Sequence, residues 1–165
     1  MKEKLQEYAL LAEIFGAVAV VISLLYVGFQ IQENTAERRA DSIQSINEGY
    51  RNLALTYVEN EGAGIAWHKM LDDEELTKRE VDLMSDALFA HLMQLEDTYN
   101  RYLEGYIDEE FLASKTSLEI LRITLSPQVN IIYEEMKSVE IYTTSFTNWL
   151  DAEIQKRSDT SENDT

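Results

Sequence analysis

The 165-residue sequence predicts an all-α fold, in which an N-terminal transmembrane helix continues into an antiparallel bundle of four or five helices. Residues 9–29 form an almost uncharged apolar run, with Glu13 as their single charge. Several later segments repeat apolar residues at spacings of three and four, the period of a helix with one buried face. One proline and six glycines leave little turn chemistry for a sheet.

The apolar run has the length that a membrane anchor needs. At about 1.5 Å per residue, 21 helical residues cover roughly 30 Å, the hydrocarbon thickness of a bilayer. A core helix is usually shorter, and no small-x-small cleavage pattern follows Phe29. Interfacial helices carry a charged face, whereas Ile14 to Phe29 carry no charge. We therefore expect a single-pass anchor in contact with the lipid bilayer.

The charge of the chain is concentrated after the anchor. The formal net charge is −17, of which residues 1–31 contribute only −1. An acidic surface repels phosphate backbones, so no nucleic-acid partner is expected. The absence of cysteine excludes disulfides and thiolate metal sites. We expect residues 1–31 to form the N-terminal segment and transmembrane helix, residues 32–157 an acidic helical-bundle domain, and residues 158–165 a disordered tail.

The first helix is expected to run without a break from about Leu5 to Val58. It leaves the membrane and joins the bundle through an apolar seam. The seam consists of Ile43, Ile46, Tyr50, Leu53 and Tyr57. Residues 61–64, Glu-Gly-Ala-Gly, are expected to end this helix with a glycine in the left-handed conformation.

Two helices are expected next. A short one covers Ile65 to Leu71, and Thr77 with Glu80 then forms a capping box. The helix that this box opens ends near Gly105. Its seam consists of Met84, Leu88, His91, Leu95, Tyr99, Tyr102 and Tyr106.

The last part of the chain carries two further start signals. Asp108 is expected to cap a helix, and Ser126-Pro127 is expected to begin another. The buried face of the first of these helices is expected to consist of Phe111, Leu118, Leu121 and Leu125. The final helical segment extends to about Lys156. The sequence does not decide whether this segment breaks near Ser138.

Small and polar residues share one face of the anchor. On a helical wheel they fall within about 60° of one another. They are Ala12, Gly16, Ala19, Ser23 and Gln30. Small residues let membrane helices approach closely, and serine or glutamine can bond across the contact. This packing face predicts a homo-oligomer or a partner membrane protein.

No motif in the sequence has the residues of a catalytic or metal site. His91 lies on an apolar seam, which is typical of a core histidine, and His68 has only Asp72 one turn away. The acidic run Asp72–Glu75 lacks the alternation of a calcium loop. Glu13 is expected to reach water at the interface. We expect no enzyme, and no catalytic, cofactor or metal residues.

The segment from Gly16 to Thr35 carries a Ser-Leu-x-Tyr…Gln-Ile-x-x-Asn-Thr pattern. It resembles an uncharacterised group of small bacterial single-pass membrane proteins with an acidic helical domain. Tyr106 to Phe111 looks like a helix start of that group. The resemblance implies the bacterial inner (cytoplasmic) membrane and no activity. Members place arginines directly after the anchor, whereas Gln32 and Glu33 stand there in this chain.

The charges that flank the anchor bear on its orientation. Lys2 and Lys4 precede it, and Arg38 and Arg39 follow it, which favours a cytoplasmic C-terminal domain by a narrow margin. Two functions remain open. One is a membrane-anchored module for protein interaction or self-association. The alternative is a membrane-tethered sensor or small-ligand module, whose pocket would be lined by Tyr50, Tyr57, Tyr99, Tyr102 and Tyr106.

Overall fold

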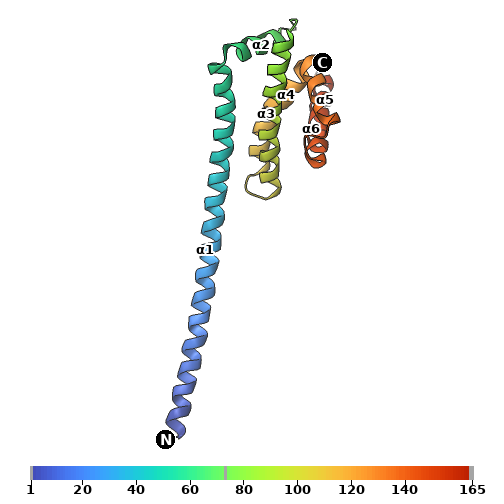
Figure 1. Cartoon of the computed structure of the whole chain (residues 1–165). Helices are drawn as coiled ribbons and strands as arrows, with labels where there is room; N and C mark the ends of the chain where they lie inside the picture. Colours follow the sequence, from blue (N-terminus) through green and yellow to red (C-terminus); the bar gives the residue numbers. More distant parts are fainter. Residues whose placement is uncertain (1, 73, 164–165) are drawn as a thin grey trace. The chain divides into compact units, whose positions relative to one another are not determined.

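The computed structural model describes residues 2–72 and 74–163, which form six helices. The helices are α1 (Lys2–Glu59), α2 (Glu61–Leu71), α3 (Lys78–Leu103), α4 (Glu109–Leu125), α5 (Pro127–Ser138) and α6 (Thr144–Asn163) (Figure 1). No strand occurs among the described residues. The predicted all-α fold is therefore confirmed, including the long first helix. The break that the sequence left open separates α5 from α6.

The chain divides into two compact units after Asp41, ten residues later than the boundary expected from the sequence. The first unit contains only the N-terminal part of α1, and its described side chains from residue 13 to residue 41 are all exposed. The second unit begins at Ser42 and contains the end of α1 together with α2 to α6.

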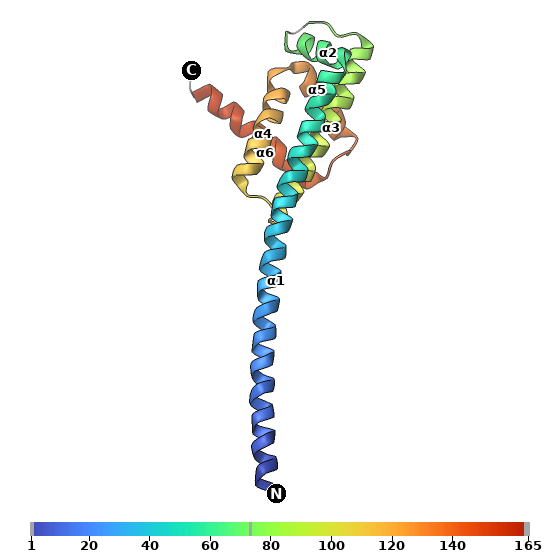
Figure 2. The same cartoon turned by 90° about the vertical axis from the view of Figure 1, so that its left-hand side faces the viewer.

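In the second unit, α3 contacts α2, α4 and α5, and α4 also contacts α5 and α6. Figure 1 shows α3 and α4 running antiparallel. Figure 2 shows the last turns of α6 extending past α4. The largest fully buried apolar side chains are those of Ile46, Leu92, Leu95, Ile123, Tyr133, Phe146 and Leu150. The predicted seam of α3 is buried from Met84 to Tyr99, as expected.

The predicted helix starts after residue 71 are confirmed in detail. The Thr77 hydroxyl accepts from the Glu80 amide, and the Glu80 carboxylate accepts from the Thr77 amide at 2.7 Å. The Asp108 carboxylate accepts from the Phe111 amide at 2.8 Å, which satisfies one of the free donors of α4. Ser126 caps α5, with Pro127 as its first residue. Gly105 takes a φ of 77°, the left-handed conformation that ends α3.

The junction between α1 and α2 differs from the expectation. Gly62 and Gly64 lie inside α2, and neither has a positive φ. The Asn60 side chain instead accepts from the Ala63 amide at 3.2 Å, so α2 begins at Glu61 rather than at Ile65. Asparagine is a strong N-cap, and this cap replaces a glycine-based helix end.

The predicted buried face of α4 is only partly correct. Phe111 packs against the core and Leu121 is half-buried, whereas the side chain of Leu125 lies outside the described residues. Leu118 is 49% exposed, whereas Glu119 is fully buried. The buried residues of this helix are Leu112, Thr116, Glu119, Ile120 and Ile123. This stripe includes a threonine and a glutamate, and hydrophobic periodicity assigns such polar residues to the surface. Inside the bundle, His91 and Arg122 both contact the Oε1 atom of the Glu119 carboxylate.

The expected disordered tail covers residues 158–165. The structure instead continues α6 through Asn163, and residues 164 and 165 lie outside the described residues. The segment contains neither proline nor glycine, the two strongest helix breakers, although most of its residues are weak helix formers.

The Glu80 carboxylate of the capping box makes the stability of the bundle vary with pH in the acidic range. Hydrogen bonds from the Lys69 ammonium, the Thr77 amide and the Thr77 hydroxyl lower the pKa of Glu80 from 4.5 to about 2. A carboxyl group whose pKa is lower in the folded state stabilises that state above its unfolded pKa. The contribution is lost as the pH falls through the folded value. Glu80 therefore stabilises the bundle fully above about pH 4.5 and loses this effect towards pH 2.

We expect Glu80→Gln to make the stability of the full-length protein less dependent on pH between about 4.5 and 2. Glutamine keeps a capping-box side chain and removes the titrating charge. Thermal unfolding at a series of pH values, followed by circular dichroism, measures this slope. Glu110→Gln, at an exposed carboxylate of α4, is the control and should leave the slope unchanged. Equal slopes for wild-type protein and Glu80→Gln would contradict the expectation.

Candidate functional site

The apolar part of α1 has no cover within the chain. Its large apolar side chains between Ile14 and Ile31 are each 45–71% exposed. Among the described residues, α1 is the one helix that is long and apolar enough to cross a membrane, judged by length and composition. Because this stretch is not buried, it is not a core helix of this chain.

The predicted packing face lies on this uncovered stretch. Gly16, Ala19, Ser23 and Gln30 are exposed, and the side chain of Ala12 lies outside the described residues. A Cβ built at Gly16 meets no atom within 4 Å. The Gln30 amide donates to the Tyr26 hydroxyl at 3.0 Å, one turn earlier. The face is therefore sterically open.

A buried polar cluster lies between α3 and α4 in the second unit. The Arg122 Nη1 atom lies 2.5 Å from the Glu119 Oε1 atom and 2.8 Å from the His91 Nδ1 atom. The His91 Nδ1 atom is 3.1 Å from the same carboxylate oxygen. Glu119 is fully buried, and the Arg122 side chain is only slightly exposed. An internal ion pair thus joins two turns of α4 and connects them to α3.

The carboxylate of this cluster is stabilised in its charged form. Burial by itself would raise the pKa of Glu119, but hydrogen bonding to His91 and the positive charges of His91 and Arg122 outweigh it. The pKa of Glu119 is therefore lowered. Burial, helped by the negative charge of Glu119, raises the pKa of Tyr50. Tyr50 therefore stays protonated at neutral pH.

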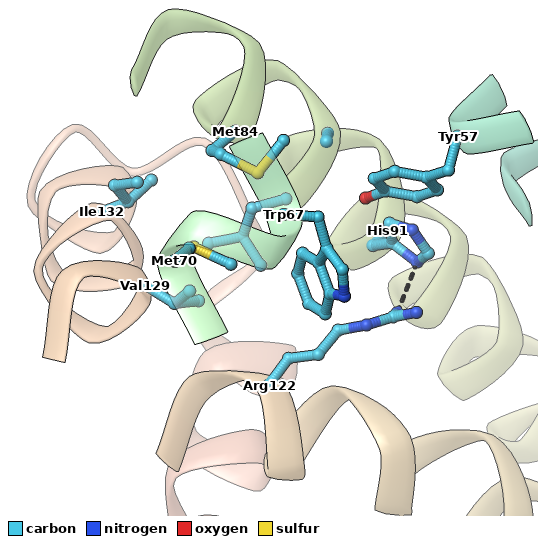
Figure 3. A pocket seen from close by; sticks show the side chains of 10 residues that line it. Tyr57, Trp67, Met70, Met84, His91, Arg122, Val129 and Ile132 are labelled. Carbon is cyan, nitrogen blue, oxygen red and sulfur yellow. Dashed lines mark hydrogen bonds between the residues drawn. The ribbon is translucent and has the colours of Figure 1, made fainter. Parts of the chain in front are cut away.

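Aromatic rings surround the cluster. The Arg122 guanidinium lies 5.3 Å from the centre of the Trp67 ring, within cation–π range. The Tyr57 ring lies 5.9 Å from that of Trp67 and 5.8 Å from that of His91. Figure 3 shows His91 between Tyr57 and Arg122. The void that these side chains line measures about 10 Å³, enough for about one water molecule.

Sequence reasoning found one member of this cluster and missed two. His91 was expected in the core, and it is buried. Glu119 and Arg122 were not singled out, although their spacing of three residues permits an ion pair on one helix face. That spacing is common on exposed helices, so the sequence alone gives no reason to place the pair inside the bundle.

A larger cavity opens beside the cluster, between the end of α1 and α3. Its volume is about 180 Å³, and Tyr57 and His91 belong to its lining. Of the five tyrosines expected at a pocket, Tyr57 lines this one. Tyr99 instead stacks on Trp149 at a ring distance of 4.5 Å, and Tyr50 lies 5.5 Å from the Lys115 ammonium.

A shallow groove of about 320 Å³ lies between α5 and the start of α3. Ile132 forms part of its buried surface, and the exposed side chains of Val81 and Ile131 stand beside it. Glu75 and Glu135 contribute exposed carboxylates to the same groove. The groove thus combines apolar area with negative charge.

His68 and Asp72 lie one turn apart, and no third metal-ligating side chain is grouped with them among the described residues. Within residues 2–72 and 74–163, no group of three histidine, aspartate or glutamate side chains is placed to hold a metal ion. Comparison with protein-family models, with curated proteins and with solved structures finds no match to this chain.

Proposed function

We propose that this chain is a membrane-anchored interaction module. Residues 13–31 cross a bilayer, the bacterial inner membrane, and pack against the same helix of a second copy. The acidic bundle then stands in the cytoplasm, where it docks a protein partner. The observation that carries the proposal is the uncovered apolar length of α1, whose large side chains are 45–71% exposed.

The free-energy cost of exposing the apolar stretch of α1 to water supports a lipid bilayer as its cover. Roughly a dozen large apolar side chains in water would cost about 25 cal/mol for each Å² exposed. A helix satisfies all of its own backbone hydrogen bonds, so lipid can cover it without leaving polar groups unpaired. Soluble monomers rarely expose contiguous apolar surface of this extent.

The anchor is tested with charges placed in its middle. Val21→Arg combined with Leu25→Arg should move most of the protein out of the carbonate-resistant membrane fraction. Each arginine at the centre of a membrane helix opposes insertion by about 2.5–3.5 kcal/mol. The control, Gln32→Arg with Asn34→Arg, adds the same charge just past the apolar stretch and should stay in the membrane. Equal membrane fractions for the two double variants would overturn the anchor.

The packing face is tested at a glycine that has no neighbour within the chain. A Cβ at Gly16 or at Gly28 meets nothing within 4 Å, so leucine at either position leaves the single helix undisturbed. Gly28 lies on the opposite side of the helix. Gly16→Leu should weaken self-association in the membrane by about tenfold or more, and Gly28→Leu should not. Equal effects would contradict a contact through this face.

The groove on the bundle supports docking of a basic, amphipathic helical segment. Its apolar area suits the apolar face of such a helix, and its carboxylates suit flanking lysines or arginines. The net charge of −17 favours the same class of partner. A synthetic 18-residue leucine–lysine helix, measured by fluorescence anisotropy, is a suitable probe.

We expect Ile131→Glu to weaken binding of this probe by about tenfold, because a charge then replaces apolar contact. Ile131 and Val139 are 60% and 66% exposed, so substitution of either should leave the fold intact. Val139→Glu adds the same negative charge outside the groove and should bind as tightly as wild type. If the two variants bind the probe equally, the probe is attracted only by the overall negative charge of the protein, and the groove is not the docking site.

A further inference from the structure

The cavity between the end of α1 and α3 has the size of a small-molecule site. Its volume of about 180 Å³ is comparable to an engineered cavity of about 150 Å³ that binds benzene. Ala63 closes it at the start of α2, and Ala87 and Ala90 line it from α3. These three alanines leave the space that longer side chains would fill. One six-membered ring with a short substituent fits this volume.

The inner surface of this cavity is apolar and aromatic. Leu53 and Tyr57 line it from α1 and Leu83 lines it from α3, and all three side chains are half-buried. Figure 3 shows the Tyr57 ring lying beside His91. A ring that enters the cavity therefore exchanges water for apolar contact and for an aromatic face. Small-molecule sites commonly combine such an apolar interior with a few polar groups.

The polar groups of the lining lie at its solvent-exposed edge. The Thr56 hydroxyl already donates to the Asn52 carbonyl at 3.1 Å. The Asn60 side-chain oxygen accepts from the Ala63 amide at 3.2 Å. Asp86 is also exposed at this edge, and its carboxylate has no hydrogen bond or ion pair with any described residue. Asp86 is therefore the acceptor at the mouth that a ligand can engage without breaking a contact of the fold.

Charge selects the class of ligand. The lining contains no lysine or arginine within the described residues, and the whole chain carries a net charge of −17. Both features attract a cation and repel an anion. Because Asp86 is exposed, an ammonium group beside it keeps part of its water. The pair thus avoids the desolvation cost of a buried ion pair.

We propose that this cavity binds a small organic cation, consisting of one apolar ring and a short alkylammonium chain. The ring fills the space beside Ala87 and Ala90 and packs against Tyr57. The ammonium group pairs with the Asp86 carboxylate at the mouth. The site shares no residue with the membrane anchor or with the groove on α5. It gives the bundle a receptor role in addition to its role in protein interaction.

Three ligands of similar shape test the charge preference: the cation phenethylamine, the neutral phenethyl alcohol and the anion phenylpropionate. Binding is followed by NMR through the methyl groups of Ala87 and Ala90, in the full-length protein in detergent at low ionic strength. Free ligand concentrations are set by dialysis, so partition into detergent does not enter the comparison. The amine should shift both signals to saturation and bind about three- to fivefold more tightly than the alcohol, as expected for one exposed ion pair. The anion should bind most weakly. No saturable shift with the amine, or equal binding of amine and alcohol, would overturn the proposal.

Two substitutions locate the ligand. Asp86→Asn keeps the shape of the side chain without its charge, so it should reduce the affinity for the amine to that for the alcohol and leave the alcohol unaffected. Glu110→Gln removes one negative charge from an exposed position of α4 and should change neither affinity. Ala90→Leu fills the cavity and should abolish saturation of the Ala87 signal. The exposed Asp86 variant decides the matter by itself, should Ala90→Leu fail to fold. Amine binding that survives Ala90→Leu, or that Glu110→Gln weakens as much as Asp86→Asn does, would contradict the site.

Discussion

Glu119→Ala is expected to lower the free energy of unfolding by about 3–5 kcal/mol, because it removes one partner of a buried ion pair. The carboxylate is fully buried and lies 2.5 Å from the Arg122 Nη1 atom. Without it, the guanidinium and the His91 imidazole lose their common acceptor and α3 loses its polar link to α4. Urea unfolding of the full-length protein in detergent, followed by circular dichroism, measures the change.

Two controls separate the ion pair from the loss of a side chain. Glu110→Ala, at an exposed position of the same helix, should cost less than about 1 kcal/mol. Glu119→Leu with Arg122→Met and His91→Leu removes the two charges together with the imidazole that would otherwise lose its partners, so this triple variant should recover most of the lost stability. A triple variant as unstable as Glu119→Ala would show that the unpaired polar groups do not account for the effect.

Phe146→Ala is also expected to cost about 3–5 kcal/mol, here through a cavity in the apolar core. The Phe146 ring is fully buried, with ring centres of Tyr142, Trp149 and Tyr99 at 5.7, 5.8 and 6.0 Å. Alanine removes these contacts and leaves a void between α3 and α6. The same urea measurement should give a lower midpoint with an unchanged slope.

The matched control for this aromatic cluster is Phe89→Ala. Phe89 touches the edge of the cluster, with its ring 6.3 Å from that of Tyr142, and it is partly open to solvent. We expect it to cost about 1 kcal/mol, because less apolar area leaves water on folding. Equal losses for Phe89→Ala and Phe146→Ala would contradict the position of the core between α3 and α6.

Sequence reasoning succeeded where the determining contacts are local. The caps at Thr77, Asp108 and Ser126 each depend on residues within three positions. The long first helix follows from its composition alone. At Asn60, however, two local signals compete: an N-cap that begins a helix and glycines that can end one. The N-cap prevails, and Gly62 and Gly64 lie inside α2 instead of ending α1.

The candidate sites depend on distant parts of the chain, and this is why the sequence did not reveal them. Glu119 pairs with His91, 28 residues earlier, and a glutamate without a visible partner is assigned to the surface. The cavity arises where α1, α2 and α3 meet around Ala63, Ala87 and Ala90. Alanines are frequent helix residues, and only the packing of three helices turns these into a space.

The most direct test of the proposed module is disulfide cross-linking in native membranes. The chain has no cysteine, so a single introduced one reports a single position. Ser23 lies on the packing face, and Val21 lies at nearly the same depth about 160° around the helix. We predict that oxidation links Ser23→Cys chains into dimers and leaves Val21→Cys chains monomeric. Equal cross-linking of the two variants, or none in either, would contradict a membrane-anchored module that associates through this face.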